Sequence, residues 1–258
     1  MLIYTFTKSK EDKKNIFVML ITNIGIAYIF EYFVLNLFRA YKYMPKVFKQ
    51  QTIDNIFGAI LSQAVFVPIT SVFITALNLR WKAKLLFGLY FYIIDIFFLK
   101  LKVYKHNWWK SVYTLTLIPI YFVISDKWHS LLKKDNPIIK LLTLYLSILS
   151  TGINLYFLLA VMGVYRFGKG KYPSWREHFI IAPIYCMFLS LYAAWANIKR
   201  GLLPKLSILL VCFGVDSLLI KMNILKTKFR IPIENLFVHV SMIIVSWSYK
   251  RWIYEYRK

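Results

Sequence analysis

The amino-acid sequence predicts an all-α fold: a polytopic integral membrane bundle of about eight transmembrane helices, without a soluble domain. Hydrophobic residues make up 59% of the 258 residues, whereas soluble domains contain about 45–50%. The mean hydropathy is +0.54. The apolar residues also form long blocks with charges between them, and a spanning helix needs about 20 mostly apolar residues.

Eight apolar blocks are predicted to span the bilayer as helices. Lipid-exposed backbone must satisfy its hydrogen bonds internally, and these blocks are too long for the strands of a barrel. The fourth and eighth blocks are the shortest, at about 17 residues, which is close to the lower limit for crossing. Within one transmembrane domain over 1–258, the predicted spans are 15–38, 53–79, 83–104, 109–125, 137–163, 179–198, 202–220 and 232–249.

Prolines and cysteines fit these helices. Pro137 is expected at the first position of a helix, where its missing N–H costs nothing. Cys186 and Cys212 lie inside apolar blocks and are predicted to be small buried hydrophobes, not a disulfide or a metal pair. The first apolar run is too long for a signal peptide, so we expect it to remain as a helix. Kinks inside spans are expected at Pro68, Pro119 and Pro183.

The stretch KVYKHNWWKS, residues 102–111, separates two apolar runs and is predicted to lie at the membrane–water interface. Tryptophan rings favour the headgroup level, and lysines extend to lipid phosphates. Residues 39–49 and 166–178 have similar composition. A specific basic site for an anionic lipid or ligand is the alternative. The interfacial candidates are Arg39, Lys42, Lys102, Lys105, Trp108, Trp109, Lys110, Arg166, Lys169 and Lys171.

The formal charge of +23 raises the question of a nucleic-acid partner. The basic residues are spread over short segments without a nucleic-acid-binding motif, so we expect none. Anionic membrane lipids are the expected partners. Eighteen of the 34 Lys and Arg fall on the side of the termini and sixteen on the other. This difference of two favours cytoplasmic termini, and one miscounted span would reverse it.

Ionisable residues inside spans are costly and are functional candidates by default. Glu31, Asp95 and Asp216 are the acidic residues clearly within apolar runs. At 1.5 Å per residue, all three lie roughly 6–13 Å below the membrane surface opposite the termini. The polar side chains predicted at a similar depth are Gln63, Asn154 and His239. Together they predict a polar layer close to that surface.

Two interpretations of this polar layer remain open. Each polar group could satisfy a neighbouring side chain or a backbone carbonyl. Alternatively, two or more carboxylates could share a water-filled cavity, where proximity and burial raise one another's pKa. That arrangement suits proton-coupled transport, cation binding or general acid–base chemistry.

Catalytic motifs are scarce. The sequence contains no H-E-x-x-H, G-x-S-x-G or P-loop motif and no aspartate-rich D-x-x-D pair. The loop histidines His106 and His178 lack metal-ligand spacing. We therefore predict neither a metal site nor a cofactor. We also detect no internal repeat with a convincing period.

Three stretches carry a resemblance: Ala40-Tyr41-Lys42-Tyr43-Met44-Pro45, Gly58-Ala59-Ile60-Leu61-Ser62-Gln63 and His106-Asn107-Trp108-Trp109-Lys110. Over the first half of the chain, they resemble uncharacterised multi-pass membrane proteins of spore-forming Gram-positive bacteria. The resemblance implies a bacterial plasma membrane and no particular activity.

Three functions agree with these observations. The first is a small transporter or channel-like protein whose carboxylates handle protons or cations. The second is a non-catalytic membrane partner, such as an assembly or immunity factor, whose carboxylates are structural. The third is a membrane-embedded enzyme acting on a lipid or isoprenoid phosphate. We expect the first because carboxylates inside membranes are more often functional than structural.

Overall fold

The computed structural model describes residues 1–170, 173–199, 201, 203–227 and 232–254, with the backbone alone for 232–236. The fold is helical, as predicted from the sequence. Residues 1–258, treated above as one transmembrane domain, contain two compact units divided after Ile139. We call them unit 1 and unit 2 and describe each by itself.

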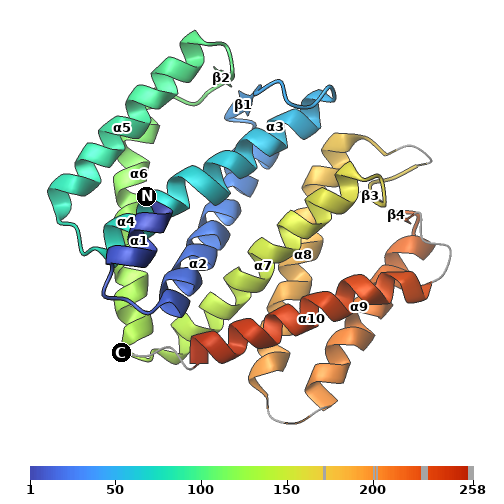
Figure 1. Ribbon diagram of the computed structural model, residues 1–258. Coiled ribbons are helices and arrows are strands. Elements are labelled where there is room, and N and C mark those ends of the chain that lie inside the picture. The colour runs from blue at the N-terminus through green and yellow to red at the C-terminus, as the bar shows by residue number, and fades with distance from the viewer. Residues whose placement is uncertain (171–172, 200, 202, 228–231, 255–258) are drawn as a thin grey trace. The chain divides into compact units, whose positions relative to one another are not determined.

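Unit 1 begins with a short helix that the sequence did not predict and continues with long helices and two short strands (Figure 1). Two of the long helices contain a π-helical segment, η1 or η2. The elements are α1 Leu2–Lys8, α2 Lys13–Glu31, η1 Tyr32–Leu37, β1 Tyr41–Tyr43, α3 Gln51–Ile60, η2 Leu61–Phe66, α4 Val67–Ala76, α5 Trp81–Lys100, β2 Tyr104–His106 and α6 Ser111–Lys133.

Unit 2 has the same order of long helices and strands. Its elements are α7 Pro137–Val161, β3 Tyr165–Phe167, α8 Trp175–Ile198, α9 Leu203–Lys221, β4 Leu225–Thr227 and α10 Pro232–Tyr254. In both units the order is helix, strand, helix, helix, strand, helix. Asp95 and Asp216 hold matching places, each nine residues before the first residue of the second strand, Tyr104 or Leu225. The structure thus contains a repeat that the sequence alone did not reveal.

The strands begin in the same way in both units. Each follows a helix whose C-terminus is closed by a residue with positive φ: Arg39 (51°), Lys102 (56°), Gly163 (70°) and Asn223 (57°). The next residue's N–H returns to a carbonyl in the last turn, as from Ala40 to Val34 (2.9 Å) and from Ile224 to Leu219 (2.9 Å). These are Schellman-type helix ends. They redirect the chain from a helix axis into a strand.

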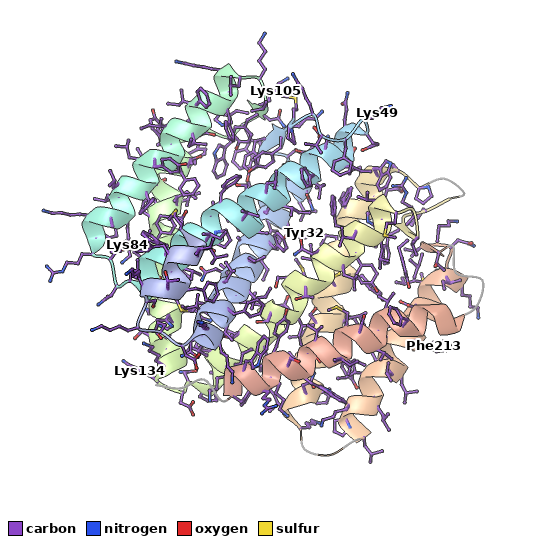
Figure 2. All side chains as sticks on the ribbon, viewed as in Figure 1. Tyr32, Lys49, Lys84, Lys105, Lys134 and Phe213 are labelled. Atoms are coloured by element: carbon purple, nitrogen blue, oxygen red, sulfur yellow. The ribbon has the colours of Figure 1, made fainter. Side chains whose placement is uncertain are left out.

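The strands of each unit pair with each other. β1 is antiparallel to β2, with Tyr41 opposite His106, and β3 is antiparallel to β4, with Tyr165 opposite Thr227. The pairing places both strand-containing loops of unit 1 at one end of its helices. Figure 2 shows Lys49 and Lys105 at that end and Lys84 and Lys134 at the opposite end. The successive long helices of unit 1 therefore run in alternating directions.

Local sequence signals explain several helix starts. Asp12 caps α2 by accepting the N–H of Lys14 (3.2 Å), and Ser174 caps α8 in a capping box with Glu177. In the first turn of α3, Asp54 accepts the N–H groups of residues 46, 47 and 48 at 2.8–2.9 Å. This carboxylate therefore orders the loop after β1.

Among the described residues, five helices are long and apolar enough to cross a membrane, judged by length and composition. The other three long helices, α5, α6 and α10, coincide with the third, fourth and eighth predicted spans. Helices α6 and α10 have 23 residues each and are longer than the predicted blocks, because their polar last turns remain helical. The five candidates cover Lys13–Leu37, Gln51–Ala76, Pro137–Val161, Trp175–Ile198 and Leu203–Lys221.

Glycines allow close packing at two places in unit 1. A Cβ atom on Gly88 of α5 would lie 2.5 Å from Pro119 Cγ of α6. A Cβ atom on Gly58 of α3 would lie 2.4 Å from Tyr43 Cβ of β1. Both distances are shorter than van der Waals contact, so these helix–helix and helix–strand approaches require glycine. The second contact fixes β1 against the helix that leads to Gln63.

Candidate carboxylate sites

Glu31 lies at the end of α2 and forms the centre of a polar contact in unit 1. Its side chain is 5% exposed. Oε2 accepts hydrogen bonds from Tyr41 Oη (2.6 Å) and from Gln63 Nε2 (3.0 Å). Glu31 and Gln63, placed at a similar depth by the sequence, are thus in direct contact.

Both partners in this contact adjoin irregular helix geometry. Glu31 directly precedes the π segment η1, and Gln63 lies inside the π segment η2. The second segment leads to Pro68, which has no N–H to continue the α-helical ladder. A π segment inserts a residue into a helix and is frequent at functional sites. Here η1 and η2 lie where the Glu31 carboxylate and the Gln63 amide approach each other.

Asp95 in α5 has a different partner. Its Oδ1 lies 3.2 Å from Nε2 of His106, the last residue of β2. The side chain is 6% exposed, although it lies in an otherwise apolar run. The strand pairing therefore carries a loop histidine to a carboxylate inside the bundle. The sequence analysis had assigned this histidine to the interface.

Aromatic rings connect the two carboxylates of unit 1. Tyr41 packs against Tyr104 (5.3 Å between ring centroids) and Trp109 (5.2 Å), and Tyr43 packs against Tyr104 (5.0 Å). Tyr104 in turn contacts the ring of His106 at 5.1 Å. Glu31 and Asp95 thus lie against one aromatic cluster.

The phenols of this cluster stay protonated. Burial raises the pKa of Tyr41 well above its usual range, and the negative charge of Glu31 adds to the shift. Burial likewise raises the pKa of Tyr43 and Tyr104. Tyr41 therefore acts as a hydrogen-bond donor to Glu31 and not as an acid.

In unit 1, Glu31 and Asp95 each use one carboxylate oxygen in the hydrogen bonds described above. Glu31 Oε1 and Asp95 Oδ2 are buried and have no hydrogen-bond partner among the described residues. No Lys or Arg in the described part of the chain lies within ion-pair distance of either group. A buried, ionised oxygen without a partner is costly. Binding of a proton at either carboxylate would remove this cost.

In unit 2, Asp216 of α9 is bound on both oxygens. His239 Nε2 of α10 lies 2.8 Å from Oδ2, and Tyr185 Oη of α8 donates to Oδ1 at 2.6 Å. Tyr156 Oη of α7 lies 3.1 Å from Tyr185 Oη. Four helices therefore meet at one carboxylate. Of these residues, the sequence predicted Asp216 and His239.

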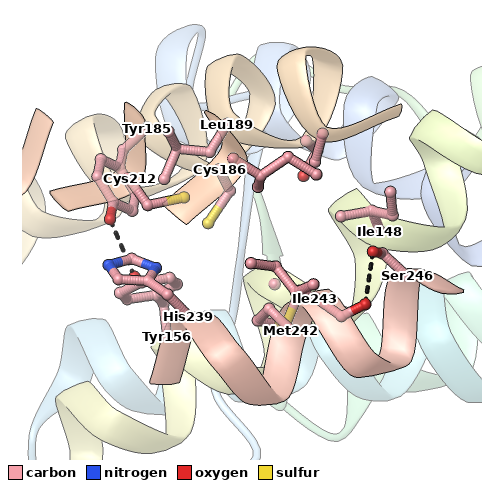
Figure 3. Close-up of a pocket in the computed structure, with 14 residues that line it drawn as sticks. Ile148, Tyr156, Tyr185, Cys186, Leu189, Cys212, His239, Met242, Ile243 and Ser246 are labelled. Atoms are coloured by element: carbon pink, nitrogen blue, oxygen red, sulfur yellow. Dashed lines mark hydrogen bonds between the residues drawn. The ribbon is translucent and has the colours of Figure 1, made fainter. Parts of the chain in front are cut away.

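A cavity of about 50 Å³ begins beside this group. Figure 3 shows His239 and Tyr156 at one end and Ser246 and Ile148 at the other. The walls are mostly apolar, with hydroxyl, imidazole and thiol groups between them. The lining residues from α7 and α8 are Ile148, Gly152, Tyr156, Tyr185, Cys186, Leu189, Ser190 and Ala193, and those from α9 and α10 are Ile208, Cys212, His239, Met242, Ile243 and Ser246.

Asn154 does not join the carboxylate sites through the hydrogen bond described for it. Its amide Nδ2 donates to Ser150 O of its own helix at 2.8 Å. Of the six predicted polar groups, Glu31 thus contacts Gln63 and Asp216 contacts His239, whereas Asp95 contacts His106, which was not among the six. The tyrosines that donate to Glu31 and Asp216 were not predicted. Nothing in their sequence distinguishes Tyr41 and Tyr185 from the other seventeen tyrosines of the chain.

The interfacial candidates lie mainly in and beside the paired strands. Lys42, Lys105 and Arg166 are strand residues, whereas Arg39 and Lys102 close helices. Trp108 is 49% exposed and donates to Phe38 O, whereas Trp109 is 8% exposed and donates to Thr114 Oγ1. Lys110 and Lys169 are exposed, and Lys171 lies outside the described residues.

Arg166 occupies a special place among these candidates. Its guanidinium lies 3.2 Å from the ring centroid of Trp175. Nη1 is buried without a hydrogen-bond partner among the described residues, and burial lowers the pKa of this side chain. The ring of Trp175 also packs against His178. Nε2 of His178 is likewise buried without a hydrogen-bond partner among the described residues. The unpartnered N–H groups of Arg166 and His178 suit an anionic group. A specific site for an anionic lipid or ligand, the alternative to a purely interfacial role, needs such donors.

Comparisons with known proteins do not extend these assignments. No protein-family model matches the chain, and no curated protein or solved structure is similar to it. Among the described residues, no group of three or more His, Cys, Asp or Glu is placed to hold a metal ion. The function is therefore inferred from the geometry of the carboxylates.

Proposed function

We propose that the chain spans a bacterial plasma membrane eight times and carries protons or cations across it. Strand pairing supports the number of spans. In unit 1, β2 pairs with β1, so α5 and α6 reach the end at which α2–η1 and α3 meet β1. With 20 and 23 residues, they are about 30 and 35 Å long. Both lengths suffice to cross the hydrocarbon core, which is about 30 Å thick.

The same reasoning applies to α10. Helices α7, α8 and α9 are three of the five candidate spans, and β4 at the end of α9 pairs with β3. Helix α10 starts from that end and runs for 23 residues. Apolar side chains such as Leu86 of α5, Ile120 of α6 and Ile244 of α10 are 51–65% exposed. Such surfaces suit lipid contact.

The unpartnered oxygens of Glu31 and Asp95 carry the functional proposal. A carboxylate with a structural role in a membrane is expected to be neutralised by a fixed cation or by a full set of donors. These two groups have tyrosine, glutamine and histidine partners on one oxygen and none on the other. They are therefore suited to bind and release a proton or a small cation.

Proton flux into liposomes containing the purified protein tests this function. A potassium gradient with valinomycin would drive protons inward, and a pH-sensitive dye in the lumen would report them. Asp95→Asn and Glu31→Gln are expected to abolish the flux, because neither amide can take up a proton at neutral pH. Replacing protons by Na⁺ or K⁺ as the permeant ion identifies the transported species.

Asp12→Asn is the matched control. Asp12 is exposed at the start of α2, and asparagine caps helices as well as aspartate does. It removes one negative charge without touching either carboxylate site. Wild-type-like flux in Asp95→Asn and Glu31→Gln would contradict the proposal. Absence of proton and cation flux in the wild type would instead favour the non-catalytic membrane partner, in which the carboxylates are structural.

A further inference from the structure

We propose that the core of unit 2 is a hydrated path for protons from Asp216 to Asn197 and Lys250. This inference rests on the function proposed above and names both the ion and its route within unit 2. The carboxylate end of the path is the Asp216–His239–Tyr185–Tyr156 group, and its middle is the cavity of about 50 Å³.

Residues at helical spacing line the path from all four helices. Helix α7 contributes residues 148, 152 and 156, and α9 contributes 208, 212 and 216. Helix α8 contributes 185, 189 and 193, followed by 197, and α10 contributes 239, 243 and 246, followed by 250. These intervals of three or four residues keep one face of each helix toward the path. From His239 to Ser246 the path extends about 10 Å along α10.

The cavity has both the room and the polar groups that water needs. A buried water requires roughly 10–15 Å³ of such space and two to four polar partners. The cavity of about 50 Å³ therefore has room for a few waters. Its lining residues include Tyr156, Tyr185, Ser190, Ser246 and His239, which carry polar groups between the apolar walls. A chain of hydrogen-bonded waters between these groups transfers protons, because it accepts a proton at one end and releases a different proton at the other end.

Polar contacts continue beyond the cavity. Ser246 Oγ accepts from Asn197 Nδ2 at 3.0 Å, and the Lys250 ammonium donates to Asn197 O. Asn197 is fully buried, and its Oδ1 has no hydrogen-bond partner among the described residues. An unpartnered acceptor at the end of a cavity is a binding position for a further water. Asn197 is the second-last residue of α8, so this end of the path lies opposite the strands.

The two native cysteines report on water in the cavity. Cys186 and Cys212 are free and buried, and both line the cavity. Their S–H stretching bands in the infrared would shift on transfer of the reconstituted protein to D₂O only if water reaches the thiols. Cys186→Ser and Cys212→Ser assign the two bands. We expect rapid exchange of both, and bands that persist for hours would show a dry cavity and overturn the proposal.

Filling the cavity tests the route. A Cβ at Gly152 would meet Met242 Cε at 3.6 Å and Cys186 Sγ at 3.7 Å, so Gly152→Leu places its further carbons in the cavity. A Cβ at Gly214 of α9 would meet nothing within 4 Å, which makes Gly214→Leu the matched control. We expect Gly152→Leu to abolish thiol exchange and most of the proton flux, and Gly214→Leu to preserve both.

The outcomes separate the route from the function. Flux that Asp95→Asn abolishes but Gly152→Leu leaves unchanged would overturn the route alone. Flux of Na⁺ or K⁺ without proton flux in the wild type would also overturn the route alone, whereas absence of all ion flux would overturn both the proposed function and the route, even if thiol exchange showed a hydrated cavity. Equal loss of flux in Gly152→Leu and Gly214→Leu would also overturn the route, because the effect would then be independent of the cavity.

Discussion

Unit 1 and unit 2 share one order of helices and strands but solve the problem of a buried carboxylate differently. In unit 1, rings fill the space around Glu31 and Asp95, and each carboxylate has one unpartnered oxygen. In unit 2, Asp216 is bound on both oxygens, and a cavity remains beside it. The shared order of elements thus places Asp95 and Asp216 at matching positions, whereas the neighbouring residues decide whether rings or a cavity lie beside the carboxylate.

The largest expected effect distinguishes packing in the two units. Gly58→Ala should destabilise unit 1 by about 1–3 kcal/mol, because overpacking near Tyr43 forces the backbone to move. Gly152→Ala should instead stabilise unit 2 by up to about 1 kcal/mol, because alanine favours helices and its Cβ makes ordinary contacts. Thermal unfolding in detergent measures both. Equal destabilisation would break the contrast between a filled and an open core.

Neutralising the aspartates at matching positions should also separate the units. Asp216→Asn should cost about 1–3 kcal/mol, because His239 and Tyr185 lose a carboxylate that accepts from both. Asp95→Asn should leave stability nearly unchanged, since the carboxylate it replaces has an unpartnered buried oxygen. Denaturant unfolding compares the two variants. A larger loss for Asp95→Asn would show that Asp95 has a structural role.

The smallest expected effect concerns pH and the start of unit 1. Burial by itself raises the pKa of Glu11, but the hydrogen bond from Lys133 and the charge of His129 outweigh it and lower the pKa below its usual 4.5. Glu11 therefore stabilises the folded state above pH 4.5, and this contribution is lost as the pH falls through the lowered value. Because the pair is partly solvated, we expect less than about 1 kcal/mol.

The pH dependence of unfolding for wild type and Glu11→Gln measures this contribution. The two stabilities should approach each other as the pH decreases from 6 to 3. Parallel curves would show that the contact between Glu11 and α6 does not stabilise unit 1. Unit 2 provides the internal comparison, because the Glu11 contact belongs wholly to unit 1.

The sequence predicted the helices well because long apolar runs determine where they form. It underestimated α6 and α10, since the last turns of both contain charged residues that the apolar pattern excludes. It could not predict η1 and η2 or the strand pairs, because these depend on contacts between segments far apart in the chain. The shared order of elements also escaped detection, because the strands that complete it are only three residues long and were not predicted.

Part of the candidate sites was located by comparing how deep each polar residue lies along its predicted helix. This comparison brought Glu31 near Gln63 and Asp216 near His239, and both pairs are in contact. It did not identify the partner of Asp95, because His106 was predicted at the interface and reaches the carboxylate through the pairing of β1 with β2. It also grouped Asn154 with the carboxylates, and the hydrogen bond described for this amide goes to Ser150 O of its own helix.

The strand pairs have a mechanical consequence for each unit. In unit 1, β1 and β2 tie the four long helices together at one end through backbone hydrogen bonds, whereas the opposite end has only turns and side-chain contacts. The end joined by the strands therefore acts as a pivot about which the helices tilt. Over a helix about 30 Å long, a tilt of about 5° about the strands displaces the far end by roughly 2–3 Å. Opening of a unit therefore requires least disruption at the end remote from its strands.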